Sequence, residues 1–300
     1  MRVTTRARAR HRTDAVRRAP LAPGASVSVL LALVCWLACT PARAAQLELT
    51  PQQQELKVLT ARLSSADVEE RRAAVTRLGA LGRAEASRAA SVALGDAAPV
   101  VRATAARAVL SLPPGEAATL ILPLLRDRDE FVRREAAYAL GLARSNVAVS
   151  ALAAALETDK KPSVRGAAAV ALGQIGDAAA APALAGALSR RLRAAGFFNH
   201  VRRRKVEEDE FVRRASAVSL GQVGSREAVP VLVEALSNAR TPDDVRREAA
   251  RALGLIGDPA AVPALRAVLA ERDPYLSRIA FEALQKLDPA NAVRPAGGGV

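Results

Sequence analysis

Apolar and polar residues alternate with a helical period along most of the chain, and one ten-residue segment of this kind recurs seven times. Its consensus is V-R-x-x-A-A-x-A-L-G. In the copy VRREAAYALG, Val132, Ala136 and Leu140 fall on one helical face, and the arginines begin the opposite face. The copies start at Glu70, Val101, Val132, Val164, Val212, Val245 and Leu276. Successive starts lie 31 to 33 residues apart, except for one interval of 48. A fixed period of this kind indicates a helical solenoid.

Each copy is predicted to form the first helix of a helical hairpin. An aspartate stands three residues before four of the copies, where its carboxylate can cap a helix. These aspartates are Asp67, Asp129, Asp209 and Asp273. We expect the glycine that closes a copy to end its helix before a turn such as Gly176-Asp177. The closing glycines are Gly141, Gly173, Gly221 and Gly254. A second helix with proline in its first turn follows, as in AVPVLVEAL from Ala228.

These features resemble HEAT-like repeats of the phycobilisome-lyase type. The resemblance covers about residues 66–287 and implies an all-α fold, namely a right-handed α-α superhelix (a HEAT/armadillo-like solenoid) of about seven helical hairpins. In that family, an Asp and an Arg near the start of the first helix help to tie neighbouring repeats together. Pairs with this spacing are Asp67–Arg71, Asp129–Arg133 and Asp209–Arg213. The second, fourth and sixth copies depart from it, so the resemblance implies an incomplete ladder.

The N-terminal segment, residues 1–44, has the features of a signal peptide. An apolar run from Ala25 to Cys39 follows a basic stretch, and Ala42-Arg43-Ala44 forms a small-x-small cleavage site. The run is shorter than the roughly 20 residues that a membrane-spanning helix needs. We therefore expect an exported protein, periplasmic or secreted. Membrane association is expected only if the segment is not cleaved or if Cys39 is lipidated.

The remaining chain divides into three segments by its sequence pattern. Residues 45–65 are predicted to form an N-terminal capping helix, residues 66–287 the solenoid, and residues 288–300 a disordered tail. The formal net charge is +14, of which residues 1–44 contribute +7 through eight arginines and one aspartate. The other 256 residues carry the remaining +7, so nucleic acid is not expected as a partner.

The long interval contains an insertion at about residues 190–205. It places Phe197 and Phe198 among basic residues. One interpretation is a hairpin that docks a protein partner through these two phenylalanines and the arginines Arg202, Arg203 and Arg204. The other interpretation is a longer helix pair in which the phenylalanines pack on their own repeat. The sequence does not decide between the two.

Candidate chemistry is sparse. His200 is the single histidine after residue 44, so no catalytic triad, metal site or cofactor site is expected. The sequence favours a non-enzymatic exported scaffold that binds a protein partner through a surface built from the second helices. The resemblance leaves a bilin lyase or chromophore chaperone as the first alternative. A nucleic-acid-binding solenoid is the second alternative, through the basic insertion.

Overall fold

The computed structural model describes residues 49–193 and 205–291. The chain divides into two units, residues 1–50 and 51–300, and the second contains all the described helices and strands. The predicted signal peptide and residues 292–300 of the predicted tail lie outside the described residues.

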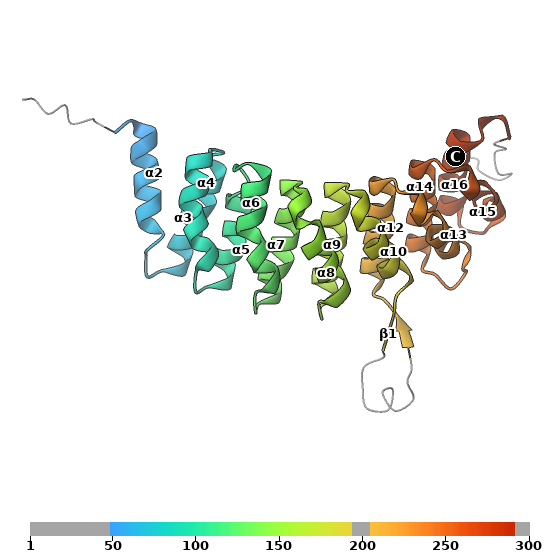
Figure 1. Ribbon diagram of the computed structural model, residues 1–300, viewed down its shortest axis with the longest axis horizontal. Coiled ribbons are helices and arrows are strands. Elements are labelled where there is room, and N and C mark those ends of the chain that lie inside the picture. Colours follow the sequence, from blue (N-terminus) through green and yellow to red (C-terminus); the bar gives the residue numbers. More distant parts are fainter. Residues whose placement is uncertain (1–48, 194–204, 292–300) are drawn as a thin grey trace, which may run out of the picture. The chain divides into compact units, whose positions relative to one another are not determined.

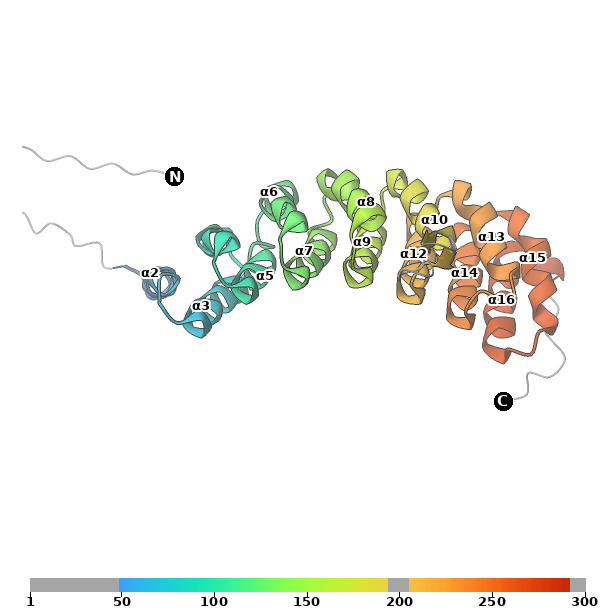
Figure 2. The same ribbon diagram turned by 90° about the horizontal axis from the view of Figure 1, so that it is seen from below.

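Helices that carry the repeated segment form one layer of the second unit, and the helices that follow them form another (Figure 2). The first helices are α3 (Val68–Ala80), α5 (Pro99–Ala108), α7 (Glu130–Ala143), α9 (Pro162–Ile175), α12 (Glu210–Val223), α14 (Asp243–Ile256) and α16 (Pro274–Leu287). The second helices are α4 (Ala84–Ser91), α6 (Pro114–Ile121), α8 (Val149–Thr158), α10 (Ala181–Ser189), α13 (Val229–Ser237) and α15 (Val262–Ala267). The hairpins follow one another in a single row (Figure 1).

This arrangement confirms the predicted α-helical solenoid, with two differences. Six hairpins are complete, whereas the seventh repeat contributes α16 and a short 3-10 turn, Pro289–Asn291, within the described part of the chain. The fold also departs from all-α at the insertion, where β1 (Arg191–Arg193) pairs with β2 (Lys205–Glu207). One more helix, α2 (Pro51–Arg62), lies in the segment predicted to cap the solenoid and packs on α3 through the buried Leu59.

Aspartate caps begin four of the first helices, as predicted. The carboxylate of Asp129 accepts a hydrogen bond from the Phe131 amide at 2.8 Å. Asp67, Asp209 and Asp273 accept hydrogen bonds from the amides at the starts of α3, α12 and α16 in the same way. These caps satisfy backbone donors that have no partner inside the helix.

The prediction that the closing glycines end the helices was wrong. Those glycines lie inside the first helices. Glycine is needed at these positions because the backbone of the next first helix comes too close for a side chain. A Cβ atom on Gly141 would lie 2.7 Å from Ala171 Cα, and one on Gly221 would lie 2.9 Å from Ala252 Cα. The helix-ending glycines come three residues later and have positive φ angles. They are Gly176, Gly224 and Gly257.

The ladder between repeats is also different from the expected one. In the first three repeats, an arginine of the first helix uses Nε and Nη2 to bind both oxygens of an aspartate that precedes the next first helix. Arg102, for example, binds Asp127 with two hydrogen bonds of 2.8 Å. The same arginine donates through Nη1 to the Asp96 and Ala97 carbonyls of the loop before its own helix. Each arginine therefore joins two consecutive inter-repeat loops.

The acid in each rung is not the N-cap aspartate that the resemblance implied. Asp129 caps α7, whereas Asp127, two residues earlier, binds Arg102. The row of arginines, here called the ladder, runs through six repeats, including those expected to lack a rung. Its members are Arg71, Arg102, Arg133, Arg165, Arg213 and Arg246, paired with Asp96, Asp127, Asp159, Glu208, Glu207 and Glu271.

The aspartates of the ladder are held in the ionised form. The hydrogen bond from Arg71 lowers the pKa of Asp96, against the effect of burial. Burial alone would raise the pKa of Asp127, but hydrogen bonds from Arg102 and from the Asp129 amide outweigh it and lower that pKa. These rungs are therefore ion pairs with two parallel hydrogen bonds, a geometry that fixes orientation as well as supplying energy.

The ladder stops at the seventh repeat. Serine, Ser277, stands where the other repeats have arginine, and it is buried. Its hydroxyl donates toward the carbonyls of Val268 and Glu271 at 3.4 Å. Asp288, the acid that follows α16, forms an ion pair with Arg266 of α15.

Candidate functional site

Neither a metal centre nor a membrane span is found in the parts of the chain that the structure describes. Residues 49–193 and 205–291 contain no group of three or more His, Cys, Asp or Glu side chains placed to hold a metal ion. Within the same ranges, no helix combines the length and the apolar character needed to cross a bilayer.

The predicted partner-binding residues Phe197, Phe198, Arg202, Arg203 and Arg204 lie outside the described residues. The base of the insertion is described, and it is a two-stranded antiparallel ribbon in which Leu192 pairs with Val206. The ribbon leaves the row of hairpins next to α10 (Figure 1). The interpretation as a longer helix pair was therefore wrong for this base, because α10 ends at Ser189 and α12 begins at Glu210.

The base of the insertion is fixed to the ladder by Glu208. The side chain of Glu208 is fully buried and binds the Arg165 guanidinium of α9 through both carboxylate oxygens. It also accepts a hydrogen bond from the Asp209 amide at 2.8 Å and one from Arg190 at 3.4 Å. The insertion thus lengthens one loop but keeps its rung, with glutamate in place of aspartate.

The layer of first helices carries three exposed aromatic side chains that the sequence analysis did not single out. Phe131 is 40% exposed, Phe211 is 37% exposed and Tyr275 is 59% exposed. Each stands two residues after an N-cap aspartate, in the third, fifth and seventh repeats. The shared pattern Asp-x-Phe/Tyr could have identified them, because an aromatic residue at a solvent-facing position of a helix is uncommon.

Neighbouring residues hold these rings in place. The guanidinium carbon of Arg134 lies 5.2 Å from the centre of the Phe131 ring, and that of Arg247 lies 5.3 Å from the centre of the Tyr275 ring. Such cation–π contacts stabilise an exposed aromatic ring in one position. Phe211 instead lies over Gly166 of the preceding first helix, where an added Cβ would come within 2.0 Å of the ring. Phe211 and Tyr275 are therefore positioned by contacts with the preceding repeat, whereas Phe131 is positioned by a residue of its own helix.

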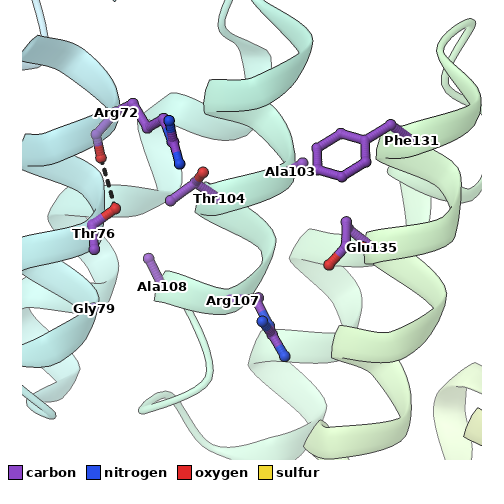
Figure 3. Close-up of a pocket in the computed structure, with 9 residues that line it drawn as sticks. All are labelled: Arg72, Thr76, Gly79, Ala103, Thr104, Arg107, Ala108, Phe131 and Glu135. Atoms are coloured by element: carbon purple, nitrogen blue, oxygen red, sulfur yellow. Dashed lines mark hydrogen bonds between the residues drawn. The ribbon is translucent and has the colours of Figure 1, made fainter. Parts of the chain in front are cut away.

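A pocket lies beside Phe131 on the layer of first helices (Figure 3). Its volume is about 360 Å³. The pocket is lined by Arg72, Thr76, Gly79, Ala103, Thr104, Arg107, Ala108, Phe131 and Glu135, which come from α3, α5 and α7. The Phe131 ring points toward Ala103 at one end, while Arg107 and Glu135 lie below it. One aromatic and several charged side chains thus surround a surface formed by the small residues Gly79, Ala103 and Ala108.

Arg107 is the charged group in this pocket that is available for a new contact. Its guanidinium has no hydrogen bond or ion pair with any residue in the described ranges, and the residue is exposed. Arg72 is already paired with Glu69 at 3.1 Å, and Glu135 with Arg134 at 3.2 Å. The pocket thus places an apolar surface beside a cation that is free within the described residues, a combination of the kind found at protein interfaces.

The family described as HEAT repeats matches residues 118–195 and 202–285 of the chain. No curated protein matches the chain. Among solved structures, the Escherichia coli protein YibA is similar, with 20% sequence identity and a TM-score of 0.54, over 78% of this chain and 81% of that one. The complex of CpcE and CpcF of phycocyanin lyase from Nostoc sp. PCC7120 has 24% identity and a TM-score of 0.45, over 78% and 88%. Human deoxyhypusine hydroxylase has 22% identity and a TM-score of 0.38, over 79% and 96%.

Proposed function

Because the chain belongs to the family of HEAT-repeat proteins, we propose that it is a non-enzymatic scaffold that binds a protein partner through the surface of its solenoid. The observation that carries the proposal is the pocket beside Phe131, which this exposed aromatic side chain shares with Arg107, a cation with no ion pair among the described residues. Aromatic residues and arginine are the residue types most enriched among the energetically important contacts of protein interfaces. This surface belongs to the first helices, rather than to the second helices that the sequence favoured.

We expect a double substitution in this pocket, Phe131→Ala with Arg107→Glu, to reduce capture of the partner about tenfold or more. The reason is that it removes the aromatic anchor and reverses the free charge. Proteins retained by the immobilised mature chain from an envelope extract would be quantified by mass spectrometry for wild type and variant.

A matched control is Val92→Ala, which shortens a 76% exposed apolar side chain at the end of α4, in the other layer. Both variants should melt within a few degrees of wild type, because Phe131, Arg107 and Val92 are all exposed. Equal capture by wild type and the double variant would remove the pocket from the proposed interface.

We also propose that the scaffold is exported, on the support of the sequence of residues 1–44 alone. The full-length chain expressed with a C-terminal tag should appear in the periplasm or medium with Ala45 as its first residue. Fractionation followed by mass spectrometry of the N-terminus measures this. An N-terminal Cys39 in the membrane fraction would indicate lipidation, and an intact chain in the cytoplasm would contradict export.

A further inference from the structure

We propose that the guanidinium of Arg213 forms a carboxylate-binding site that Glu207 of the insertion fills in this structure, and that a carboxylate of a protein partner takes the place of Glu207. The site lies between α10 and α13 and shares no lining residue with the pocket beside Phe131. That the incoming carboxylate belongs to a protein rests on the proposed function, whereas the site itself does not.

Arg213 is the ladder arginine for which the next loop provides no acid. In the first three repeats the partner stands 25 or 26 residues after the arginine, as Asp127 does for Arg102. The corresponding positions after Arg213 hold Asn238 and Ala239, and no Asp or Glu occurs between Ser237 and Pro242. The rung between the fifth and sixth repeats therefore lacks its forward carboxylate.

The Arg213 side chain nevertheless occupies the buried ladder position. The residue is 6% exposed. Its Nε donates to the Leu188 carbonyl at 3.1 Å, and Nη2 reaches the Thr241 hydroxyl at 3.4 Å, a long hydrogen bond. Within the described ranges, the one carboxylate that it contacts is that of Glu207, in an ion pair through Nη1. A buried guanidinium needs such a counter-charge, because desolvation of an unpaired charge is costly.

Glu207 is held less firmly than Glu208 and the aspartates of the first rungs. Its side chain is 39% exposed, whereas that of Glu208 is fully buried and those of Asp96 and Asp127 are both 10% exposed. Glu208 has Arg165, Arg190 and a backbone amide as partners, but Glu207 has Arg213 alone among the described residues. Rotation of the Glu207 side chain into solvent would uncover Arg213 without moving the β2 backbone.

A cavity at this point gives an incoming group access. Its volume is about 50 Å³, and a single water needs roughly 10–15 Å³. The lining residues are Leu188, Ser189, Arg190, Glu207, Arg213, Val231, Glu234, Ala235, Asn238 and Thr241. Arg190 is already bound to Glu208, and the exposed Glu234 would disfavour a second negative charge while Glu207 is present. The geometry therefore fits exchange of one carboxylate for another.

Chemical rescue tests the site directly. In the full mature chain, Glu207→Ala should lower the melting temperature by about 4–8 °C, because it leaves Arg213 without a counter-charge. Sodium acetate should then recover at least half of that loss and reach a plateau, relative to sodium chloride at the same ionic strength. Acetate should have no such effect on wild type, where Glu207 occupies the site, or on the double variant Glu207→Ala with Arg213→Gln.

The matched control is Glu210→Ala, an exposed glutamate three residues away with no ion pair in the described ranges; it should not lower the melting temperature or respond to acetate. If Glu207→Ala does not fold, Glu207→Gln keeps the shape of the side chain and should still gain stability from acetate. A peptide of alternating glutamate and alanine should stabilise the variant more than its glutamine counterpart.

Equal stabilisation by acetate and chloride, or an unchanged melting temperature for Glu207→Ala, would overturn the proposal. Rescue by inorganic phosphate but not by acetate would also overturn it, because the site would then select a different anion. A further outcome is that acetate rescues Glu207→Ala while the double variant Phe131→Ala with Arg107→Glu still captures the partner as well as wild type. That combination would support the Arg213 site and count against the pocket beside Phe131.

Discussion

Replacing Glu208 with alanine is expected to destabilise the protein by about 3–5 kcal/mol, the cost of breaking a buried ion pair from one side. Its fully buried carboxylate binds Arg165, which is itself buried, and also contacts Arg190. Removing it would take away the carboxylate that pairs with both the Arg165 and the Arg190 guanidinium groups. It would also remove the rung that fixes the base of the insertion to α9.

Urea unfolding followed by circular dichroism at 222 nm measures this loss, with Glu210→Ala as the exposed control that should stay within about 0.5 kcal/mol of wild type. Hydrogen exchange should show the loss of protection centred on α9 and α12, since repeats contact only their neighbours. A loss below about 1 kcal/mol would show that Arg165 finds another partner and that this rung is not a main support of the stack.

Gly141→Ala and Gly186→Ala are expected to change stability in opposite directions, although they are the same substitution within helices. At Gly141 the new methyl group would lie 2.7 Å from Ala171 Cα, so α7 and α9 must separate, and we expect a loss of about 1–3 kcal/mol. At Gly186 in α10 nothing lies within 4 Å of the added atom. Alanine there should stabilise by about 0.5–1 kcal/mol, because it loses less backbone entropy on folding.

Denaturant midpoints for the two variants provide the comparison. The opposite signs separate packing from helix propensity, because both substitutions gain the same propensity. A stabilising Gly141→Ala would mean that neighbouring first helices can move apart at little cost, and the layer would then be softer than its backbone spacing indicates.

The fold was predictable because its information is local and repeated. The aspartate before a copy and the proline at the start of the second helix are each recognised from a few consecutive residues. The period of about 30 residues repeats these local signals along the chain. The caps at Asp129 and Asp273 followed from this spacing. The same pattern recurs seven times at a nearly constant spacing, so the prediction is stronger than one from a single copy.

The ladder was assigned to the wrong acid because the spacing within one repeat cannot show which groups are already occupied. Asp129 and Arg133 have the family spacing, but the Asp129 carboxylate is used by the Phe131 amide. Arg133 instead binds Asp159, 26 residues ahead, and that contact exists only once the hairpins have stacked. Aligning the copies would have shown an acid six residues before several ladder arginines, as at Asp96 and Arg102.

The candidate site was missed for a related reason. The irregular interval drew attention to Phe197 and Phe198, whereas Phe131 and Arg107 lie in regular repeats where nothing interrupts the period. Their significance depends on exposure and on what lies opposite them across the stack, and periodicity reports neither. Surface chemistry therefore varies from repeat to repeat while the buried pattern stays the same.

Ser277 limits where repeats can be added to the solenoid. In the first three rungs the arginine binds an aspartate of the loop that follows it, so a duplicated copy of one of these units would bring both an arginine and an acid and would leave its rungs matched. A repeat added after α16 would meet a serine where the preceding arginine is required. The solenoid can thus become longer or shorter through duplication or deletion of these interior units, and the choice of surface residues is left open in each new copy.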